Sequence, residues 1–421
     1  MTTKARDGSE RVDEAAAGGV RVALPRLLRT FWAWSVALFG LALAVGWVEY
    51  RMGEPLWHYN PLGNPRHEDL FEFIPLYRLV HTAAFFTGKA RVSYPPFGAA
   101  IYGLIYWTGH PVLFYRSVAA AWLAAGVWGV RRSLAQQGIG AVTATLFPVT
   151  LVLVSFPIAG LLQQGNIELF LWIFAGVGTW LFLRGHDNWA AVLWGLAAAV
   201  KLFPAILLWL LLPRKWRAFG LGVGVFVLAT VLSLKWLGPT MALAWHGSLV
   251  NVFGYQGERV SELSWHELAA NHSVFGLVRF VVVMAHKSLA KLPLPYYVGG
   301  ALTMVLASFG RLWKMPVANQ LLAVTAFMVM FPPISYFYTL VHLYAPFLVL
   351  MFLAIREARE GVRIPGLRGT LLLFVLMFAS FTLFTYPAVF LYGGLFQAFV
   401  LLLLFMSALQ YPFAIGEASA A

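Results

Sequence analysis

The chain has 421 residues, of which 60% are hydrophobic and only 11% are charged, and its mean hydropathy is +0.75. Soluble domains carry about 25% charged residues, so the composition excludes a soluble globular protein and indicates a polytopic membrane protein. The formal charge of +13 indicates basic loops facing anionic lipid rather than a nucleic-acid surface, and the lack of cysteine excludes disulfides, iron–sulfur clusters and thiol nucleophiles.

The N-terminal region divides into a polar tail, a first span and a polar segment. Residues 1–30 are polar and show no hydrophobic period, which predicts a cytoplasmic tail. The apolar run 31–48 approaches the roughly 20 residues of a membrane span. It lacks a clear cleavage site, so we expect a retained signal anchor. Residues 49–92 are too polar for the hydrocarbon core, and 71–86 within them has the pattern of interfacial helices, so we expect the first external loop here.

A second polar break divides the remaining apolar runs into two sets. The runs before it lie at 93–108, 112–130, 141–160, 166–183, 189–212 and 217–237. The break itself, 238–271, holds three glutamates and a single basic residue, Arg259. A net-negative loop is expected outside the membrane. Seven crossings from a cytoplasmic N-terminus also place it outside, with the basic segment 214–217 inside.

The second half of the chain fits the charge pattern only if one apolar run does not cross the membrane. The later runs lie at 272–286, 295–310, 317–331, 336–355, 369–386 and 388–410. Four arginines between 356 and 368 are expected on the cytoplasmic side. The shortest run, 272–286, is therefore predicted to be a re-entrant or interfacial helix.

These assignments predict an all-α protein of about 12 transmembrane helices with two long external loops. Its parts are the tail 1–30, a core module 31–237 that includes the external loop 49–92, the second external loop with its re-entrant helix at 238–294, and C-terminal helices at 295–421. The expected path places Arg131-Arg132 and Arg184 outside, against the usual positive-inside bias.

Acidic residues gather in the first external loop, where His67, Glu68, Asp69 and Glu72 lie within six residues. Sugar transfer to a hydroxyl needs a base within about 2.6–3.2 Å of the acceptor proton. Repulsion from Glu68 and Glu72 is expected to raise the pKa of Asp69, and Arg66 is expected to oppose that rise. From the residues alone, a solvated loop surface is the commoner explanation. A divalent metal at His67-Glu68-Asp69 stays open but is not indicated, because the spacing matches no established ligand pattern.

Five pieces of sequence, beginning with this acidic pair, follow one another in a distinctive order. They are Glu68-Asp69 with the aromatics after it, Ser93-Tyr94-Pro95-Pro96-Phe97, Gln163-Gln164-Gly165-Asn166, the segment from Gly195 to Pro204, and the segment from Asn271 to Arg279. In this order they resemble the GT-C superfamily of integral-membrane glycosyltransferases, and within it glycosyltransferase family 87. The resemblance covers roughly residues 31–350. That family commonly shows Ser, Trp and paired His near an external helix start, where this chain has Pro332 to Thr339 and a single His342.

The resemblance implies an enzyme that moves one sugar, mannose or arabinofuranose, from a polyprenyl-phosphate donor to a hydroxyl of a lipid or cell-envelope glycan. It implies inverting displacement with Asp69 as general base and Glu68 as the alternative. No cofactor is required by this reaction. The active site is expected on the outer face of the plasma membrane, with the donor, the acceptor and membrane lipids as partners and no nucleic acid.

A leaving lipid phosphate needs cations or hydrogen-bond donors, and seven residues are assigned to donor binding. They are Arg279, His272, Asn271, Ser273, Lys201, His342 and Tyr94. The guanidinium fork of Arg279 suits phosphate, with interfacial snorkelling as its alternative. Lys201 is placed at the centre of a span, where a lysine costs about 2.5–3.5 kcal/mol on insertion scales, and snorkelling is its alternative too. Gln164 and Asn166 are expected to be packing or capping groups on the cytoplasmic side.

Two other classes of function stay open. A carrier or lipid-linked sugar flippase would depend on intramembrane groups such as Lys201, and a non-catalytic envelope assembly protein would tolerate loss of the loop acids. Transporters place ionisable groups near the midplane on helices related by internal repeats. Here the acids cluster in loops and no repeat relates the halves, which favours an enzyme.

Overall fold

The computed structural model describes residues 23–52, 82–87, 94–261, 271–284, 294–379 and 393–414. Every regular element in these ranges is a helix, and Asn271 and Tyr336 form an isolated antiparallel β-bridge. Five of the described helices are long and apolar enough to cross a membrane, or six if the bent pair α7 and α8 is one span. The predicted class, an all-α polytopic membrane protein, is confirmed.

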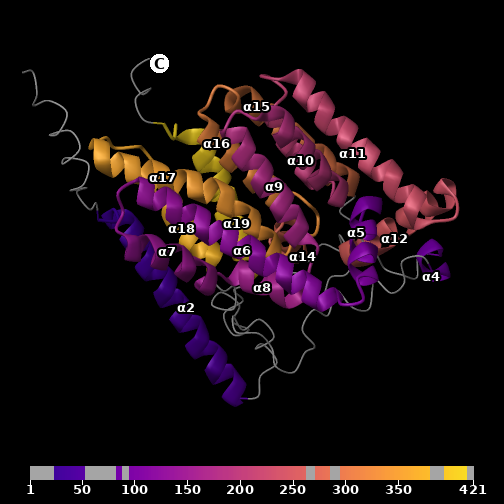
Figure 1. Cartoon of the computed structure of the whole chain (residues 1–421), viewed down its shortest axis with the longest axis horizontal. Helices are drawn as coiled ribbons and strands as arrows, with labels where there is room; N and C mark the ends of the chain where they lie inside the picture. Colours follow the sequence, from indigo (N-terminus) through magenta and orange to yellow (C-terminus); the bar gives the residue numbers. More distant parts are fainter. Residues whose placement is uncertain are drawn as a thin grey trace, which may run out of the picture.

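Figure 1 shows the described helices, and those from α5 to α12 follow one another with short connections. From the N-terminus they are α2 (Arg26–Met52), α4 (Ala83–Phe86), α5 (Pro96–Trp107), α6 (Pro111–Gln136), α7 (Ala141–Val154), α8 (Phe156–Gln164), α9 (Glu168–Leu183), α10 (Asp187–Val200), the 3₁₀ helix η2 (Phe203–Leu210), α11 (Trp216–Leu237), α12 (Met241–Ser261), α14 (Val274–Met284), α15 (Leu294–Leu312), α16 (Val317–Met330), the 3₁₀ helix η3 (Phe337–Leu343), α17 (Tyr344–Glu360), α18 (Leu367–Phe378) and α19 (Gly393–Gln410).

Proline and glycine set several helix ends. α5 and α6 begin at Pro96 and Pro111, where the missing N–H of proline costs no helical hydrogen bond. The hydroxyl of Ser155 caps α8 by accepting the Ile158 N–H at 3.3 Å. α8 then ends at Gly165, whose φ of 64° lies in the left-handed region that glycine adopts without strain. This glycine turn leads directly into the functional residues that begin α9.

One end of the helix bundle, which we call the basic rim, gathers most of the described cations. Arg359 near the end of α17 donates to Gln137 at the end of α6, at 2.9 Å. Arg214 before α11 donates to Gln320 at the start of α16, at 3.3 Å. Lys215 lies 3.9 Å from Asp187 at the start of α10. These contacts bring the ends of five helices, α6, α10, α11, α16 and α17, to one side of the protein.

The opposite end, which we call the polar rim, joins the starts of α5, α6 and α9. The Asn166 side chain donates to the Tyr94 hydroxyl at 3.3 Å, and the Ile167 N–H donates to Tyr102 at 2.7 Å. The Tyr115 hydroxyl donates to the Asn166 carbonyl at 3.1 Å. Because Tyr94 and Tyr115 both lie at this rim, the chain between them leaves the rim and returns to it. The predicted crossing at 93–108 is therefore wrong.

The predicted single helix at 189–212 is also wrong, because the chain breaks at Lys201. α10 ends at Val200, Lys201 is extended with φ −145° and ψ 145°, and η2 follows. The chain then runs back to the basic rim at Arg214. The run 189–212 thus traverses the body twice.

The predicted path has one traverse too many at 93–108 and one too few at 189–212, so the number of traverses before α11 is unchanged. Between these two places, however, each helix end lies on the rim opposite to the predicted one. Arg131-Arg132, close to the end of α6, therefore share the rim of Arg359 instead of lying opposite it. Arg184, at the end of α9, also lies on this rim, beside Asp187. The exceptions to the charge bias that the expected path created disappear.

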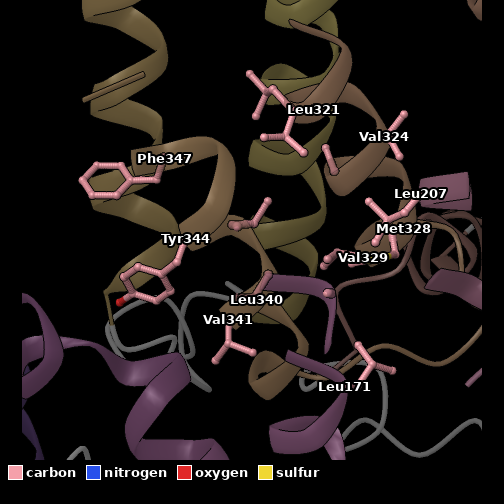
Figure 2. Packing of buried hydrophobic residues seen from close by; sticks show 14 of the residues in the cluster. Leu171, Leu207, Leu321, Val324, Met328, Val329, Leu340, Val341, Tyr344 and Phe347 are labelled. Carbon is pink, nitrogen blue, oxygen red and sulfur yellow. The ribbon is translucent and has the colours of Figure 1, made fainter. Parts of the chain in front are cut away.

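Large apolar side chains from distant segments surround η3 (Figure 2). Leu340 and Val341 of η3 are fully buried and lie among residues of α9, η2 and α16, which include Leu171, Leu207 and Met328. On another side, Gly160 of α8 lies so close to the Phe337 ring that an added Cβ would overlap it. A short 3₁₀ helix in the middle of the protein is thereby held rigidly, and it carries two of the polar side chains described below.

Candidate functional site

The predicted catalytic acids Asp69 and Glu68 lie outside the described residues, so their assignment stays a prediction. Within the described part of the chain, polar side chains form two clusters at the polar rim. The Glu168 cluster comprises Glu168, Lys201, His342, Tyr94 and Asn166. The His272 cluster comprises Asn271, His272, Ser273, Ser335 and Thr339.

Glu168 is the centre of the first cluster and is completely buried. Its Oε2 forms an ion pair with the Lys201 ammonium, and its Oε1 lies 2.7 Å from Nε2 of His342. Its own N–H donates to the Asn166 side chain at 2.9 Å, which fixes the turn that leads into α9. A buried carboxylate is tolerated when it is paired and hydrogen-bonded, and both oxygens of Glu168 have such a partner.

Lys201 is the member of this group that reaches the surface. Its side chain is 15% exposed, whereas those of Glu168 and His342 are 0% and 1% exposed. Its ammonium lies 5.4 Å from the Tyr94 ring centroid and 5.5 Å from that of Tyr338, both within cation–π range. The residue therefore lies at a helix break on the polar rim, not at the centre of a span. There a buried carboxylate, that of Glu168, holds the ammonium.

His342 connects the ion pair to the interior of the protein. Its Nδ1 is buried without a hydrogen-bond partner in the described part of the chain. It lines a cavity of about 10 Å³ together with Thr179 and Thr325. A cavity of this size has room for about one water molecule. The space behind His342 is therefore too small for a substrate-sized ligand, and the open side of Lys201 is the accessible side of this cluster.

The His272 cluster ties the start of α14 to the segment before η3. The Asn271 side chain donates to the Pro333 carbonyl at 3.0 Å, and its Oδ1 accepts the Ser335 N–H at 3.1 Å. Ser273 donates from its hydroxyl to the same Pro333 carbonyl at 3.0 Å. The polar atoms of Asn271 and Ser273 are engaged within the protein, so these two residues position the chain. Their predicted contact with the donor stays a prediction.

His272 is fully buried in this cluster. Its Nε2 lies 3.0 Å from the Ser335 hydroxyl and 3.1 Å from the Thr339 hydroxyl. Burial lowers the pKa of His272 to about 3, and no carboxylate among the described residues compensates the charged form. A neutral imidazole cannot supply the positive charge for which this residue was assigned to phosphate binding.

Arg279, the remaining predicted phosphate ligand, lies on α14 and is 7% exposed. Its guanidinium carbon lies 5.6 Å from the centroid of the Phe275 ring, one turn earlier on the same helix. The side chain is thus packed on the protein rather than extended to an interface as snorkelling requires. Its role toward the donor stays a prediction.

The two clusters meet on η3. Thr339 contacts His272, and His342, three residues later, contacts Glu168. In a 3₁₀ helix, side chains three residues apart lie one above the other. A displacement of η3 therefore disturbs both clusters at once.

Sequence reasoning missed Glu168, Ser335 and Thr339 as members of the site. The signal for Glu168 was its charge, because an acid at the start of an apolar run and a lysine inside another run are expected to pair. The expected path also placed Asn166 on the opposite side from Tyr94, and their hydrogen bond shows that this was wrong.

The model of glycosyltransferase family 87 matches residues 93–335, which is more than half of the chain. The matched segment contains Glu168, Lys201 and the whole His272 cluster except Thr339, and it ends before His342. No curated protein and no solved structure matches the chain.

Proposed function

Because the chain belongs to glycosyltransferase family 87, we propose that it transfers a sugar from a polyprenyl-phosphate donor to a hydroxyl acceptor at the polar rim. The observation that supports this donor is Lys201. Its ammonium is partly exposed, framed by the Tyr94 and Tyr338 rings, and fixed from behind by the buried Glu168. A fixed cation beside a membrane-embedded body suits the phosphate of a lipid-linked sugar.

In this mechanism the sugar is displaced directly from the carrier. The acceptor oxygen forms a bond to the anomeric carbon while the bond from that carbon to the phosphate oxygen breaks. Asp69 accepts the hydroxyl proton, and the carrier phosphate leaves with the bonding electron pair. An ammonium has three N–H donors, so Lys201 can hold Glu168 and still stabilise the negative charge that grows on the phosphate.

The position of the first external loop supports Asp69 as the base. This predicted loop, 49–92, ends two residues before Tyr94, whose ring covers Lys201. The loop is therefore attached beside the proposed phosphate site. The acceptor would be a lipid or cell-envelope glycan hydroxyl, and mannose or arabinofuranose the sugar, as the resemblance implies.

The distribution of arginines supports a site at Lys201 on the outer side of the membrane. Arginines collect at the basic rim, at the ends of α6, α9 and α17. Cytoplasmic segments carry the excess of Lys and Arg in membrane proteins. The basic rim is then cytoplasmic, and the polar rim with Lys201 faces the outer side of the plasma membrane.

The test uses purified full-length protein in lipid nanodiscs. It is incubated with a panel of polyprenyl-phosphate sugars and a hydroxyl acceptor, and the acceptor is scored by its gain in mass. We expect one hexose or pentose to be added, with inverted anomeric configuration, and the addition to fail in Asp69→Asn. Transfer from nucleotide sugars alone would show that the donor class is wrong. Undiminished transfer by a folded Asp69→Asn variant would overturn the assignment of the base.

A carrier is the second candidate, since transporters also use helix breaks such as the one at Lys201. The same nanodisc protein, moved into liposomes, separates the two functions. Movement of a lipid-linked sugar across the bilayer without any change in acceptor mass would support the carrier.

A further inference from the structure

Two tryptophan–arginine pairs with the same spacing lie near the basic rim. Arg132 lies over the Trp128 ring near the end of α6, at 5.5 Å, and Arg184 lies over the Trp180 ring at the end of α9, at 5.4 Å. All four side chains are exposed, with Trp128 57% and Trp180 54% accessible. Residues four apart on a helix are surface neighbours, and the ring attracts the cation, so each guanidinium is held in place.

α6 and α9 contact each other through Trp122 and run in the same direction. The Trp122 and Trp172 rings meet edge to face at 5.7 Å, and an added Cβ at Gly176 would lie 3.2 Å from Trp122. Both helices begin at the polar rim, where Tyr115 of α6 contacts the residues just before α9. Their C-terminal ends therefore both reach the basic rim.

Helix geometry places the two pairs on one face of α6 and α9. At 3.6 residues per turn, Trp128 and Arg132 lie about 100° to one side of Trp122, while Trp180 and Arg184 lie about 100° to the other side of Trp172. For parallel helices these opposite rotations point in the same direction. The arginines also lie at similar heights, about 15 Å beyond Trp122 and about 18 Å beyond Trp172.

No acid neutralises Arg132 or Arg184 in the described structure, whereas two other arginines of the basic rim each have an acidic partner. Arg356 pairs with Glu360 at 3.1 Å, and Arg368 with Glu357 at 3.4 Å. The acid nearest to Arg184 in sequence is Asp187, and it faces Lys215 at 3.9 Å.

The neighbouring side chains do not neutralise the positive charge of Arg132 and Arg184. Arg131 donates to Thr145 of α7 at 3.0 Å, and His186 is exposed beside Arg184. The face therefore carries an excess of positive charge bordered by two exposed indole rings.

We propose that this face binds an anionic phospholipid, with Arg132 and Arg184 on its phosphate or acidic headgroup and Trp128 and Trp180 beside its glycerol region. Guanidinium groups bind phosphate oxygens with two parallel hydrogen bonds, and indole rings favour the headgroup level of a bilayer. The proposal concerns the rim opposite Lys201, so it does not depend on the sugar-transfer mechanism.

The attraction of basic residues to anionic lipid sets how much lipid binding each arginine should contribute. Each basic residue near an anionic surface contributes about 1 kcal/mol, which corresponds to about fivefold in binding. Arg132→Gln or Arg184→Gln is expected to weaken the retention of phosphatidylglycerol about fivefold, and the double variant about 25-fold.

The experiment measures lipid retention of the full chain by native mass spectrometry, after exchange into detergent with equal phosphatidylglycerol and phosphatidylcholine. The matched control is Arg51→Gln, which removes the third pair, Trp47–Arg51 at 5.6 Å, near the end of α2 and away from α6 and α9 (Figure 1). We expect the native protein and this control to retain phosphatidylglycerol preferentially and the double variant to lose that preference.

Equal retention by the double variant would overturn the proposal, as would an equal loss in Arg51→Gln, which would show only general interfacial attraction. If the double variant does not fold, the native protein is titrated with salt. Screening weakens the binding of an anionic headgroup to exposed arginines. Retention that is unchanged between about 0.05 and 0.5 M salt would then overturn the proposal.

Discussion

Glu168 and His342 are 174 residues apart in the chain, yet Oε1 of the acid lies 2.7 Å from Nε2 of the imidazole. With Lys201 on the other oxygen, Glu168 holds together the start of α9, the break after α10 and η3. Only Lys201 among the three is open to a substrate. The arrangement is that of a buried support for one partly exposed cation.

Removing the charge of Glu168 should therefore damage both stability and activity. Glu168→Gln keeps the shape of the side chain but leaves Lys201 without its counter-charge, and breaking a buried pair costs about 3–5 kcal/mol. We expect a lower unfolding temperature in detergent and a loss of sugar transfer. Glu360→Gln, which removes an exposed pair with Arg356, is the control and should change the free energy of unfolding by less than about 1 kcal/mol.

A double variant shows whether the stability lost in Glu168→Gln comes from the uncompensated charge of Lys201 or from altered packing. Glu168→Gln with Lys201→Met removes both charges, so most of the lost stability should return while sugar transfer stays absent. If stability did not recover in the double variant, the cost of Glu168→Gln would come from packing and not from the uncompensated lysine.

Lys201→Met tests the proposed phosphate site directly. The variant keeps the length and apolar stem of the side chain but removes the positive charge. Loss of one charge-stabilising donor costs about 10²–10³ in kcat for other reactions that develop negative charge, and we expect a similar fall here. Lys215→Met removes a lysine at the basic rim, 64% exposed and paired with Asp187, and should leave kcat unchanged. A comparable fall in kcat in both variants would show that the charge of Lys201 has no specific role in the reaction.

The sequence predicted the membrane class well but not the path of the chain through it. Periodicity marks 189–212 as one apolar run, and it cannot show that the chain is extended at Lys201 in its middle. A local signal did exist, because Pro204 has no N–H to donate to the carbonyl of Val200. The direction of the break, however, is fixed by Glu168, which is distant in sequence.

Several site residues were predictable because their chemistry is unusual for their surroundings. Lys201 and His342 were identified as polar groups in apolar sequence, and the structure joins them through one acid. His272 was also identified, but its neutral state depends on burial between α14 and η3, which no local pattern encodes. Residue type therefore indicated where polar groups gather, while tertiary contacts decided which of them carries charge.

The neutral state of His272 predicts how stability depends on pH. Its pKa is lowered to about 3 in the folded protein, against about 6.5 when unfolded, so below pH 6.5 the unfolded chain binds a proton that the folded protein does not. The contribution of this residue to stability is fully present above pH 6.5. It is lost as pH falls toward 3, by about 1.4 kcal/mol per unit.

This dependence can be measured by unfolding the protein in detergent between pH 4 and 8. His272→Asn should be less stable at pH 7 but should show a flatter dependence below pH 6.5. His186→Asn, which changes an exposed histidine, is the control and should keep the native slope. An unchanged slope in His272→Asn would mean that other groups cause the acid sensitivity.

The position of η3 can be tested without touching a polar residue. In Gly160→Ala the added methyl group overlaps the Phe337 ring, so η3 or α8 has to shift. Overpacking of a buried contact costs about 1–3 kcal/mol, and we expect a loss of this order in the free energy of unfolding. Because Thr339 and His342 lie on the same short helix, sugar transfer should fall as well.

Gly126→Ala is the matched control, since this helical glycine of α6 has open space around its Cβ position. It should be neutral or slightly stabilising, because alanine favours the helix by up to about 1 kcal/mol. Native activity and stability in Gly160→Ala would mean that η3 can move without disturbing Glu168, and that the ion pair alone fixes the cation.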